Sequence, residues 1–87
     1  MTMRVSRTAL LVPQSDGKSV LEVGGRPIFS LNPVAVTIWE NLAAGLSIQD
    51  ITCQVAARFN VPNERAANDV ESFIGLLKQR FLVVDDT

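Results

Sequence analysis

The hydrophobic pattern changes its period at Asn32-Pro33, and this change divides the chain into two parts. Before it, short apolar runs are separated by glycine-containing turns, which is typical of β-strands. After it, apolar residues recur with the spacing of amphipathic helices. Because asparagine is a good N-cap and proline is tolerated at the first helical position, a helix is predicted to begin there. With 87 residues, the chain is expected to form one small α+β domain, residues 1–87.

Three strands are predicted before this boundary. They are Thr8–Val12, Val20–Val23 and Pro27–Leu31. The turns between them contain Asp16-Gly17 and Gly24-Gly25, which favour tight reversals, so the strands are expected to form an antiparallel meander. Pro27 donates no backbone hydrogen bond and is tolerated mainly at sheet edges. The third strand is therefore expected at the margin of the sheet.

Three helices are predicted after the boundary. Gly45 ends the first, Ser47 caps the second, Asn60 ends the second, and the third begins around Asn63. Their buried stripes are predicted to be Ala35, Ile38, Trp39 and Leu42; then Ile48, Ile51, Val55 and Phe59; then Ala66, Val70, Phe73, Ile74 and Leu77. A three-stranded antiparallel sheet followed by three helices is thus expected. The first few residues and Asp85 to Thr87 are expected to be frayed ends.

The residue inventory argues against catalysis. The chain has no histidine and no tyrosine, and its one cysteine, Cys53, has no histidine to activate it as a nucleophile. One cysteine without histidine does not make a zinc site, and the carboxylates have the spacing of solvated helix faces. We therefore predict no catalytic residue, no metal ligand and no cofactor.

Charge and hydropathy narrow the choice of partners. The net charge is −1, so the field that draws basic proteins to nucleic acid is missing. No apolar run approaches the length of a membrane span, and the N-terminus does not resemble a signal peptide. A lone cysteine cannot form an internal disulfide. These features predict a cytoplasmic protein that binds neither nucleic acid nor a membrane.

Two features remain as candidate binding sites. One is the backbone of Ile28, Phe29 and Ser30 in the edge strand, whose unpaired groups could accept an added peptide strand. The other is Leu76, which projects about a quarter-turn from the buried stripe of the third helix. Beside it lie Asp69, Phe73 and Arg80. We interpret Asp69 and Arg80 as polar contacts, and Phe73 and Leu76 as apolar anchors. A protected edge and a widened core stripe are the alternatives.

Several of these positions together resemble the PqqD family of small peptide-recognition elements. The resemblance lies in Phe29-Ser30-Leu31-Asn32, Ile38-Trp39, Gly45, Ile51, Phe59, Asp69-Val70, Phe73-Ile74 and Leu77. It implies a single winged-helix-like domain that binds the leader segment of a ribosomally made, post-translationally modified peptide as a strand beside the third strand, with the third helix as the other wall. It also implies presentation of that peptide to a modifying enzyme, such as a radical SAM enzyme or a leader peptidase.

One position departs from the family pattern. Family members often have Arg-Gly-Leu after the last helix, whereas this chain has Arg80-Phe81-Leu82. This predicts that the third helix extends further and that Phe81 lies near its apolar stripe.

The leading hypothesis is therefore a non-enzymatic leader-peptide chaperone of natural product biosynthesis. A winged-helix DNA-binding regulator is the first alternative, since three helices and a small sheet also describe that architecture. In this chain, however, the predicted second and third helices carry both basic and acidic residues and so leave no basic stripe for DNA. These residues are Arg58, Arg65, Lys78 and Arg80 together with Asp50, Glu64, Asp69 and Glu71. A structural homodimer, in which the edge strand pairs with its own copy, is the second alternative.

Overall fold

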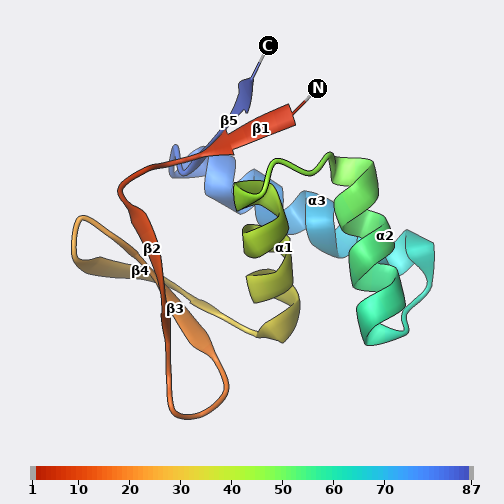
Figure 1. Ribbon diagram of the computed structural model, residues 1–87, viewed down its shortest axis with the longest axis horizontal. Helices are drawn as coiled ribbons and strands as arrows, with labels where there is room; N and C mark the ends of the chain where they lie inside the picture. The colour runs from red at the N-terminus through yellow and green to blue at the C-terminus, as the bar shows by residue number, and fades with distance from the viewer. Residues whose placement is uncertain (1, 87) are drawn as a thin grey trace.

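The chain forms two small antiparallel sheets and three helices in an α+β arrangement (Figure 1). The computed structural model describes residues 2–86, and the side chains of residues 3–84. The elements are β1 (Thr2–Val5), β2 (Ala9–Pro13), β3 (Ser19–Val23), β4 (Arg26–Leu31), α1 (Pro33–Ala43), α2 (Ile48–Phe59), α3 (Asn63–Gln79) and β5 (Val83–Asp86). Among the described residues, no helix has both the length and the apolar character needed to cross a membrane.

The predicted meander is present as the sheet β2-β3-β4. β3 is central, so β4 lies at the edge, as Pro27 predicted. The ladder between β3 and β4 is irregular: Leu21 is opposite Phe29, but the next residue, Glu22, is opposite Pro27. Ile28 is therefore an extra residue in β4, which is the arrangement of a β-bulge.

The helix boundaries follow the local signals in the sequence. The side chain of Asn32 accepts a hydrogen bond from the Ala35 N–H at 2.9 Å, and Pro33 is the first helical residue. The Ser47 hydroxyl accepts one from the Asp50 N–H at 3.1 Å and caps α2. Both bonds occupy amide donors that a helix N-terminus otherwise leaves without partners. α2 ends at Phe59, and the C-cap residue Asn60 adopts the left-handed conformation.

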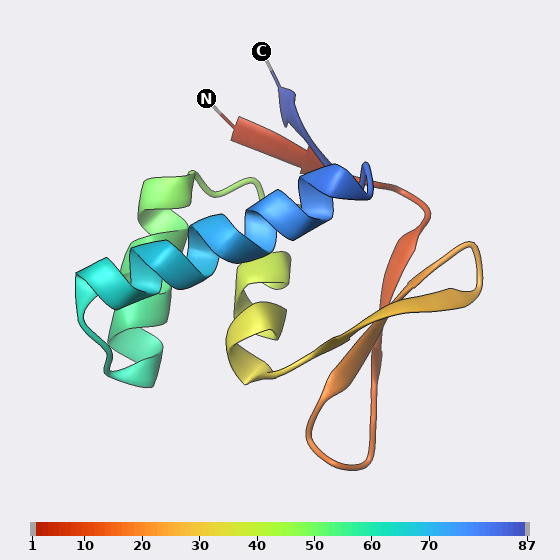
Figure 2. The ribbon, with the colours of Figure 1, turned by 180° about the vertical axis from the view of Figure 1, so that it is seen from behind.

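One apolar core joins the helices to the inner face of the sheet. α2 packs against α3, and α1 lies between α2 and the β2-β3-β4 sheet, while α3 crosses behind α1 and α2 in Figure 1 and in front of them in Figure 2. The predicted core residue Trp39 is buried, together with Leu21 and Leu31 from the sheet. Burial of each large apolar side chain contributes about 1.5–3 kcal/mol. The core thus holds β4 and α3 in fixed relation to each other.

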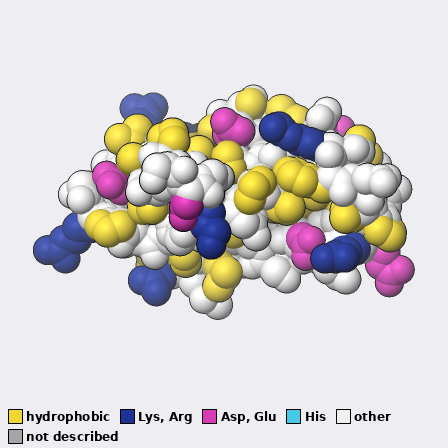
Figure 3. Space-filling view, turned by 90° about the horizontal axis from the view of Figure 1, so that it is seen from below, with side chains coloured by type: hydrophobic (Ala, Val, Ile, Leu, Met, Phe, Trp, Pro, Cys, Tyr) yellow, Lys and Arg dark blue, Asp and Glu magenta, His cyan; other side chains and the backbone are white. Residues whose placement is uncertain are grey.

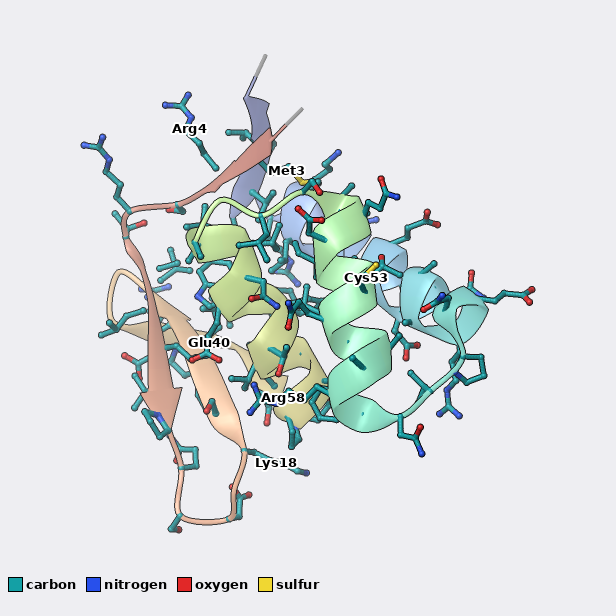
Figure 4. The ribbon with its side chains drawn as sticks, turned by 45° about the vertical axis from the view of Figure 1, so that its right-hand side comes forward. Met3, Arg4, Lys18, Glu40, Cys53 and Arg58 are labelled. Atoms are coloured by element: carbon teal, nitrogen blue, oxygen red, sulfur yellow. The ribbon has the colours of Figure 1, made fainter. Side chains whose placement is uncertain are left out.

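The two ends of the described chain pair with each other, which corrects the prediction of frayed ends. β1 and β5 form an antiparallel two-stranded sheet, and the ends of the chain lie side by side in Figure 1. Met3 and Val83 are buried, and Met3 lies beside the helices (Figure 4). The sheet closes one end of the core, so the fold contains one sheet more than predicted. Thr87 lies outside the described residues.

The end of α3 also differs from the prediction. α3 stops at Gln79, and the next turn reverses: the Leu82 N–H donates to the Leu77 carbonyl at 2.9 Å, and the Phe81 N–H donates to the Lys78 carbonyl at 3.1 Å. This is the hydrogen-bond pattern of a Schellman motif. Phe81 occupies its left-handed position with φ 59°, and its side chain is 82% exposed, well away from the apolar stripe.

Candidate functional site

The residues of β4 whose backbone groups face the open side of the sheet can be identified from the hydrogen-bond pattern of β3. The Gln14 N–H donates to the Lys18 carbonyl at 2.8 Å, so this pair is hydrogen-bonded. In an antiparallel ladder the hydrogen-bonded and non-hydrogen-bonded pairs alternate. Val20 therefore directs its backbone groups toward β2, and Leu21 directs its groups toward β4.

By the same alternation, neighbouring residues of β4 direct their backbone N–H and C=O groups to opposite sides of the strand. Ser30 is opposite Val20, and Phe29 is opposite Leu21. The N–H and C=O of Phe29 consequently face β3, whereas those of Ser30 face the open side of the sheet. Of the three residues predicted to offer their backbone, Ser30 has the clearest free edge, and Phe29 is placed to contribute its ring.

The bulge gives Ile28 a separate position at one end of this edge. Bulges change the direction of a side chain relative to regular alternation. Ile28, together with Val23, Leu82 and Arg80, lines a small cavity of about 170 Å³. We call this cavity the Ile28 pocket. It lies between the start of β4 and the end of α3, and its lining is almost entirely apolar.

A larger hollow lies at the other end of β4. It has a volume of about 420 Å³ and lies between the first turns of α1 and the middle of α3. We call it the α3 groove. Its lining residues are Asn32, Val34, Ala35, Ile38, Arg65, Asp69, Ser72, Phe73 and Leu76.

The structure divides the side chains predicted for the site into two groups. Asp69, Phe73 and Leu76 line the α3 groove together. Leu76 is 48% exposed, so it is not part of a widened core stripe. Arg80 lies outside the groove: its guanidinium is 5.8 Å from the centroid of the Phe29 ring, and it lines the Ile28 pocket. Arg80 thus lies at the Ile28 pocket, over the Phe29 ring of β4.

The first turns of α1 form a wall of the groove that the sequence interpretation missed. Val34 and Ala35 are partly buried and border the groove with Ile38. The available signal was the adjacency of this helix to the edge strand, since Asn32 directly follows β4 and caps α1. Which face of α1 meets α3, however, is set by helix packing and not by local sequence.

The site carries a mixed charge. Arg65 and Asp69 line the α3 groove, and Arg80 lines the Ile28 pocket. Within the described side chains, no carboxylate forms an ion pair with Arg80; the contact of its guanidinium is with the Phe29 ring. On the face shown in Figure 3, basic and acidic side chains are interspersed with apolar ones. This face therefore presents no continuous basic stripe.

Little in the described part of the chain has the form of a reactive centre. Cys53 is exposed on α2 (Figure 4). Among the described residues, no three cysteine, aspartate or glutamate side chains lie together in a way that could hold a metal ion. The features along β4 are instead an unpaired strand edge and the two hollows at its ends, which are suited to non-covalent binding.

These features define a small α+β domain with an open strand edge next to a groove lined by both apolar and polar side chains. Residues 17–83 match the family described as coenzyme PQQ synthesis protein D (PqqD). The match covers most of the chain, which therefore belongs to the PqqD family. This confirms the resemblance seen in the sequence.

A solved structure has the same fold over nearly the whole chain. It is described as TbiB1 in complex with the TbiA(beta) leader peptide, and it aligns with a TM-score of 0.78 at 22% sequence identity. The alignment covers 97% of this chain and 98% of that one. No match was found among curated proteins.

Proposed function

We propose that this protein is a non-catalytic peptide chaperone. In this proposal it binds the leader segment of a ribosomally synthesised precursor peptide and presents it to a modifying enzyme. The observation that carries the proposal is the open edge of β4 beside the α3 groove. Membership of the PqqD family and the likeness to TbiB1, whose structure contains a leader peptide, support it.

The leader segment is proposed to bind as an additional strand of the β2-β3-β4 sheet. The backbone groups of Ser30 would pair with the peptide because they face the open side of the sheet. The Phe29 ring and the α3 side chains Phe73 and Leu76 would contact the side chains on one face of the peptide. Asp69 and Arg80 would provide polar contacts that fix its position.

Simple energetics explain why the edge needs the groove. Each strand hydrogen bond contributes a net ~0.5–1.5 kcal/mol, and ordering a flexible peptide offsets much of this gain. Burying two apolar side chains adds about 1.5–3 kcal/mol each. Together these terms approach the roughly 8 kcal/mol that corresponds to micromolar affinity.

A modifying enzyme is the expected second partner, since the chain offers binding surfaces and little reactive chemistry. A radical SAM enzyme and a leader peptidase are the two candidates. Co-purification of the protein with the enzymes encoded beside its gene, with and without leader peptide, would distinguish them. Enzyme capture that strengthens when peptide is present is the expected result.

Amide NMR shifts provide the direct test of peptide binding. The isotope-labelled protein would be titrated with leader segments of precursors encoded beside its gene, and with the same segments in scrambled order. Shifts are expected in Ile28–Leu31, in the first turn of α1 and in Phe73–Leu76. Shifts confined to other elements, or none with any leader segment, would refute the proposal.

The two alternative functions predict different results. A homodimer that pairs β4 edges would dissociate on dilution in light scattering, and its formation would compete with peptide. A DNA-binding protein would bind duplex DNA with a steep dependence on salt. The mixed charges on the face in Figure 3 do not favour that outcome.

A further inference from the structure

We infer that the modifying enzyme docks on a second surface of this protein, where an apolar hollow of the enzyme, rimmed by carboxylates, receives the exposed Phe81 ring. This inference rests on the proposed function, because it places the enzyme relative to the bound leader peptide. The surface, which we call the Phe81 patch, surrounds a hollow of about 260 Å³ whose lining includes Arg4, Arg7, Phe81, Leu82 and Val84. It lies where the end of α3 meets β1 and the connection to β2 (Figure 2).

Two large apolar side chains that the fold leaves exposed lie in this patch. Phe81 is 82% exposed and Val84 is 45% exposed, and both line the same hollow. Single exposed apolar residues are common on protein surfaces, whereas exposed apolar side chains that adjoin one another mark interaction sites. A partner that covers the hollow would remove both side chains from water.

The backbone holds the Phe81 ring outward in a fixed position. The Phe81 N–H donates to the Lys78 carbonyl at 3.1 Å, and the Leu82 N–H donates to the Leu77 carbonyl at 2.9 Å. The Leu82 carbonyl in turn accepts from the Ser6 N–H at 2.7 Å. Phe81 has φ 59°, which is disfavoured for a residue with a Cβ atom. The fold gains nothing from a strained residue whose ring is in water. A ring on an ordered backbone loses little freedom on binding, however, and aromatic residues are enriched at interfaces.

The charge of the patch indicates the kind of partner. Its lining contains the two arginines Arg4 and Arg7 and, among the described side chains, no carboxylate. Arg7 is exposed and forms no ion pair within the described part of the chain. Carboxylates on the partner would accept charge-assisted hydrogen bonds from its guanidinium.

The same charges disfavour two other occupants. A second copy of this chain, seated on the same patch about a two-fold axis, would bring arginines against arginines. An anionic membrane is bound by clusters of about 4–8 basic residues, and the lining of this patch contains two. A different protein with an acidic rim around an apolar hollow fits best.

The Phe81 patch adjoins one end of the proposed peptide site. Leu82 lines both the hollow of the patch and the Ile28 pocket, and Arg80, the residue before Phe81, contacts the Phe29 ring. An enzyme on the patch would therefore lie next to the start of β4. The α3 groove and the hollow of the patch have no lining residue in common. Peptide and enzyme can thus be bound at the same time, as presentation requires.

Two substitutions test the patch without changing the peptide site. The probe is the purified modifying enzyme encoded beside the gene of this protein, and its affinity for the leader-bound protein would be measured by biolayer interferometry. Phe81→Gly removes the ring, and Arg7→Glu reverses the charge. Each is expected to weaken enzyme binding at least about tenfold, which corresponds to about 1.4 kcal/mol.

The controls separate loss of the docking surface from loss of structure. Glycine adopts positive φ readily, so Phe81→Gly is expected to remain folded. Both variants should bind leader peptide as tightly as the parent protein does. Lys18→Glu makes the same charge change as Arg7→Glu, but in the turn between β2 and β3 and outside the patch (Figure 4). It should bind the enzyme as tightly as the parent protein does.

The outcomes distinguish failure of the inference from failure of the proposed function. Enzyme binding that either Phe81→Gly or Arg7→Glu retains in full would overturn the inference and leave the chaperone function in place. If the leader-bound parent protein binds no enzyme, presentation itself is wrong.

Two further measurements address the other occupants. Light scattering that shows a parent dimer, and a monomer for Phe81→Gly, would assign the patch to a second copy. Phosphatidylglycerol vesicles that retain the parent protein but not Phe81→Gly would assign it to a lipid surface. Either result would overturn the inference.

Discussion

The guanidinium of Arg80 lies 5.8 Å from the centroid of the Phe29 ring, so the C-cap residue of α3 is in contact with the edge strand β4. Phe29 is packed against the core, whereas Arg80 is exposed. The contact therefore joins the exposed, charged Arg80 side chain to a ring that packs against the core.

This contact is expected to contribute modestly to stability. Cation–π pairs at exposed sites contribute about 0.5–1 kcal/mol. We predict a coupling energy of this size between Arg80→Gln and Phe29→Leu in a double-mutant cycle, measured by urea unfolding. Additive effects of the two substitutions would show that the contact does not form in solution.

Amide hydrogen exchange should report the open side of β4. The Ser30 N–H faces away from β3, so it is expected to exchange rapidly in the free protein and at least about tenfold more slowly with bound peptide. The Phe29 N–H faces β3 and serves as the internal control, with protection in both states. A Ser30 amide that is already protected without peptide would mean that the edge is closed.

Leu76 provides a test of the α3 groove by substitution. Leu76→Asp is expected to abolish measurable peptide binding while leaving the circular dichroism spectrum unchanged, because the side chain is already 48% exposed. Leu10→Asp is the matched control: Leu10 is 62% exposed on β2, at the opposite edge of the sheet. If both variants bind peptide as tightly as the parent protein, α3 does not take part in binding.

The parts of this fold that could be predicted are those fixed by local chemistry. The side chains of Asn32 and Ser47 cap the starts of α1 and α2, and the ring of Pro33 suits the first position of α1. Both helices begin as expected. Leu76 could be identified because the angular step of a helix places it off the buried stripe. Pro27 placed β4 at the edge because it lacks an N–H.

The parts that were missed depend on contacts between distant segments. β1 and β5 lie at opposite ends of the sequence and are four residues each, so neither has a distinctive pattern of its own. The bulge at Ile28 exists only in relation to β3. The α1 wall of the groove depends on how α1 crosses α3. In each case, pairing or packing in three dimensions decides the outcome.

The left-handed conformation of Phe81 predicts that a glycine there would stabilise the protein. A residue with a Cβ atom is disfavoured by about 1–2 kcal/mol in this conformation, whereas glycine adopts it readily. The Phe81 side chain is 82% exposed, so little buried area would be lost. We expect Phe81→Gly to raise the free energy of unfolding by about 0.5–1 kcal/mol once the greater freedom of glycine in the unfolded chain is included.

Thermal unfolding would measure this gain, with Phe81→Ala as the control. Alanine retains the Cβ atom and the strain, so a change within about 0.5 kcal/mol is expected. An equal gain in both variants would mean that loss of the exposed ring, and not relief of the backbone, is the cause.

The pairing of β1 with β5 predicts unequal effects at two adjacent valines. Val83 is 2% exposed and packs in the core, whereas Val84 is 45% exposed. Val83→Ala removes buried methyl groups and leaves a cavity, so we expect a loss of about 2 kcal/mol. Val84→Ala should change stability by less than about 0.5 kcal/mol. For a domain of this size each kcal/mol lowers the Tm by about 4–8 °C, so calorimetry resolves the difference. Similar small effects at both positions would show that β5 is frayed in solution and that the core is closed without it.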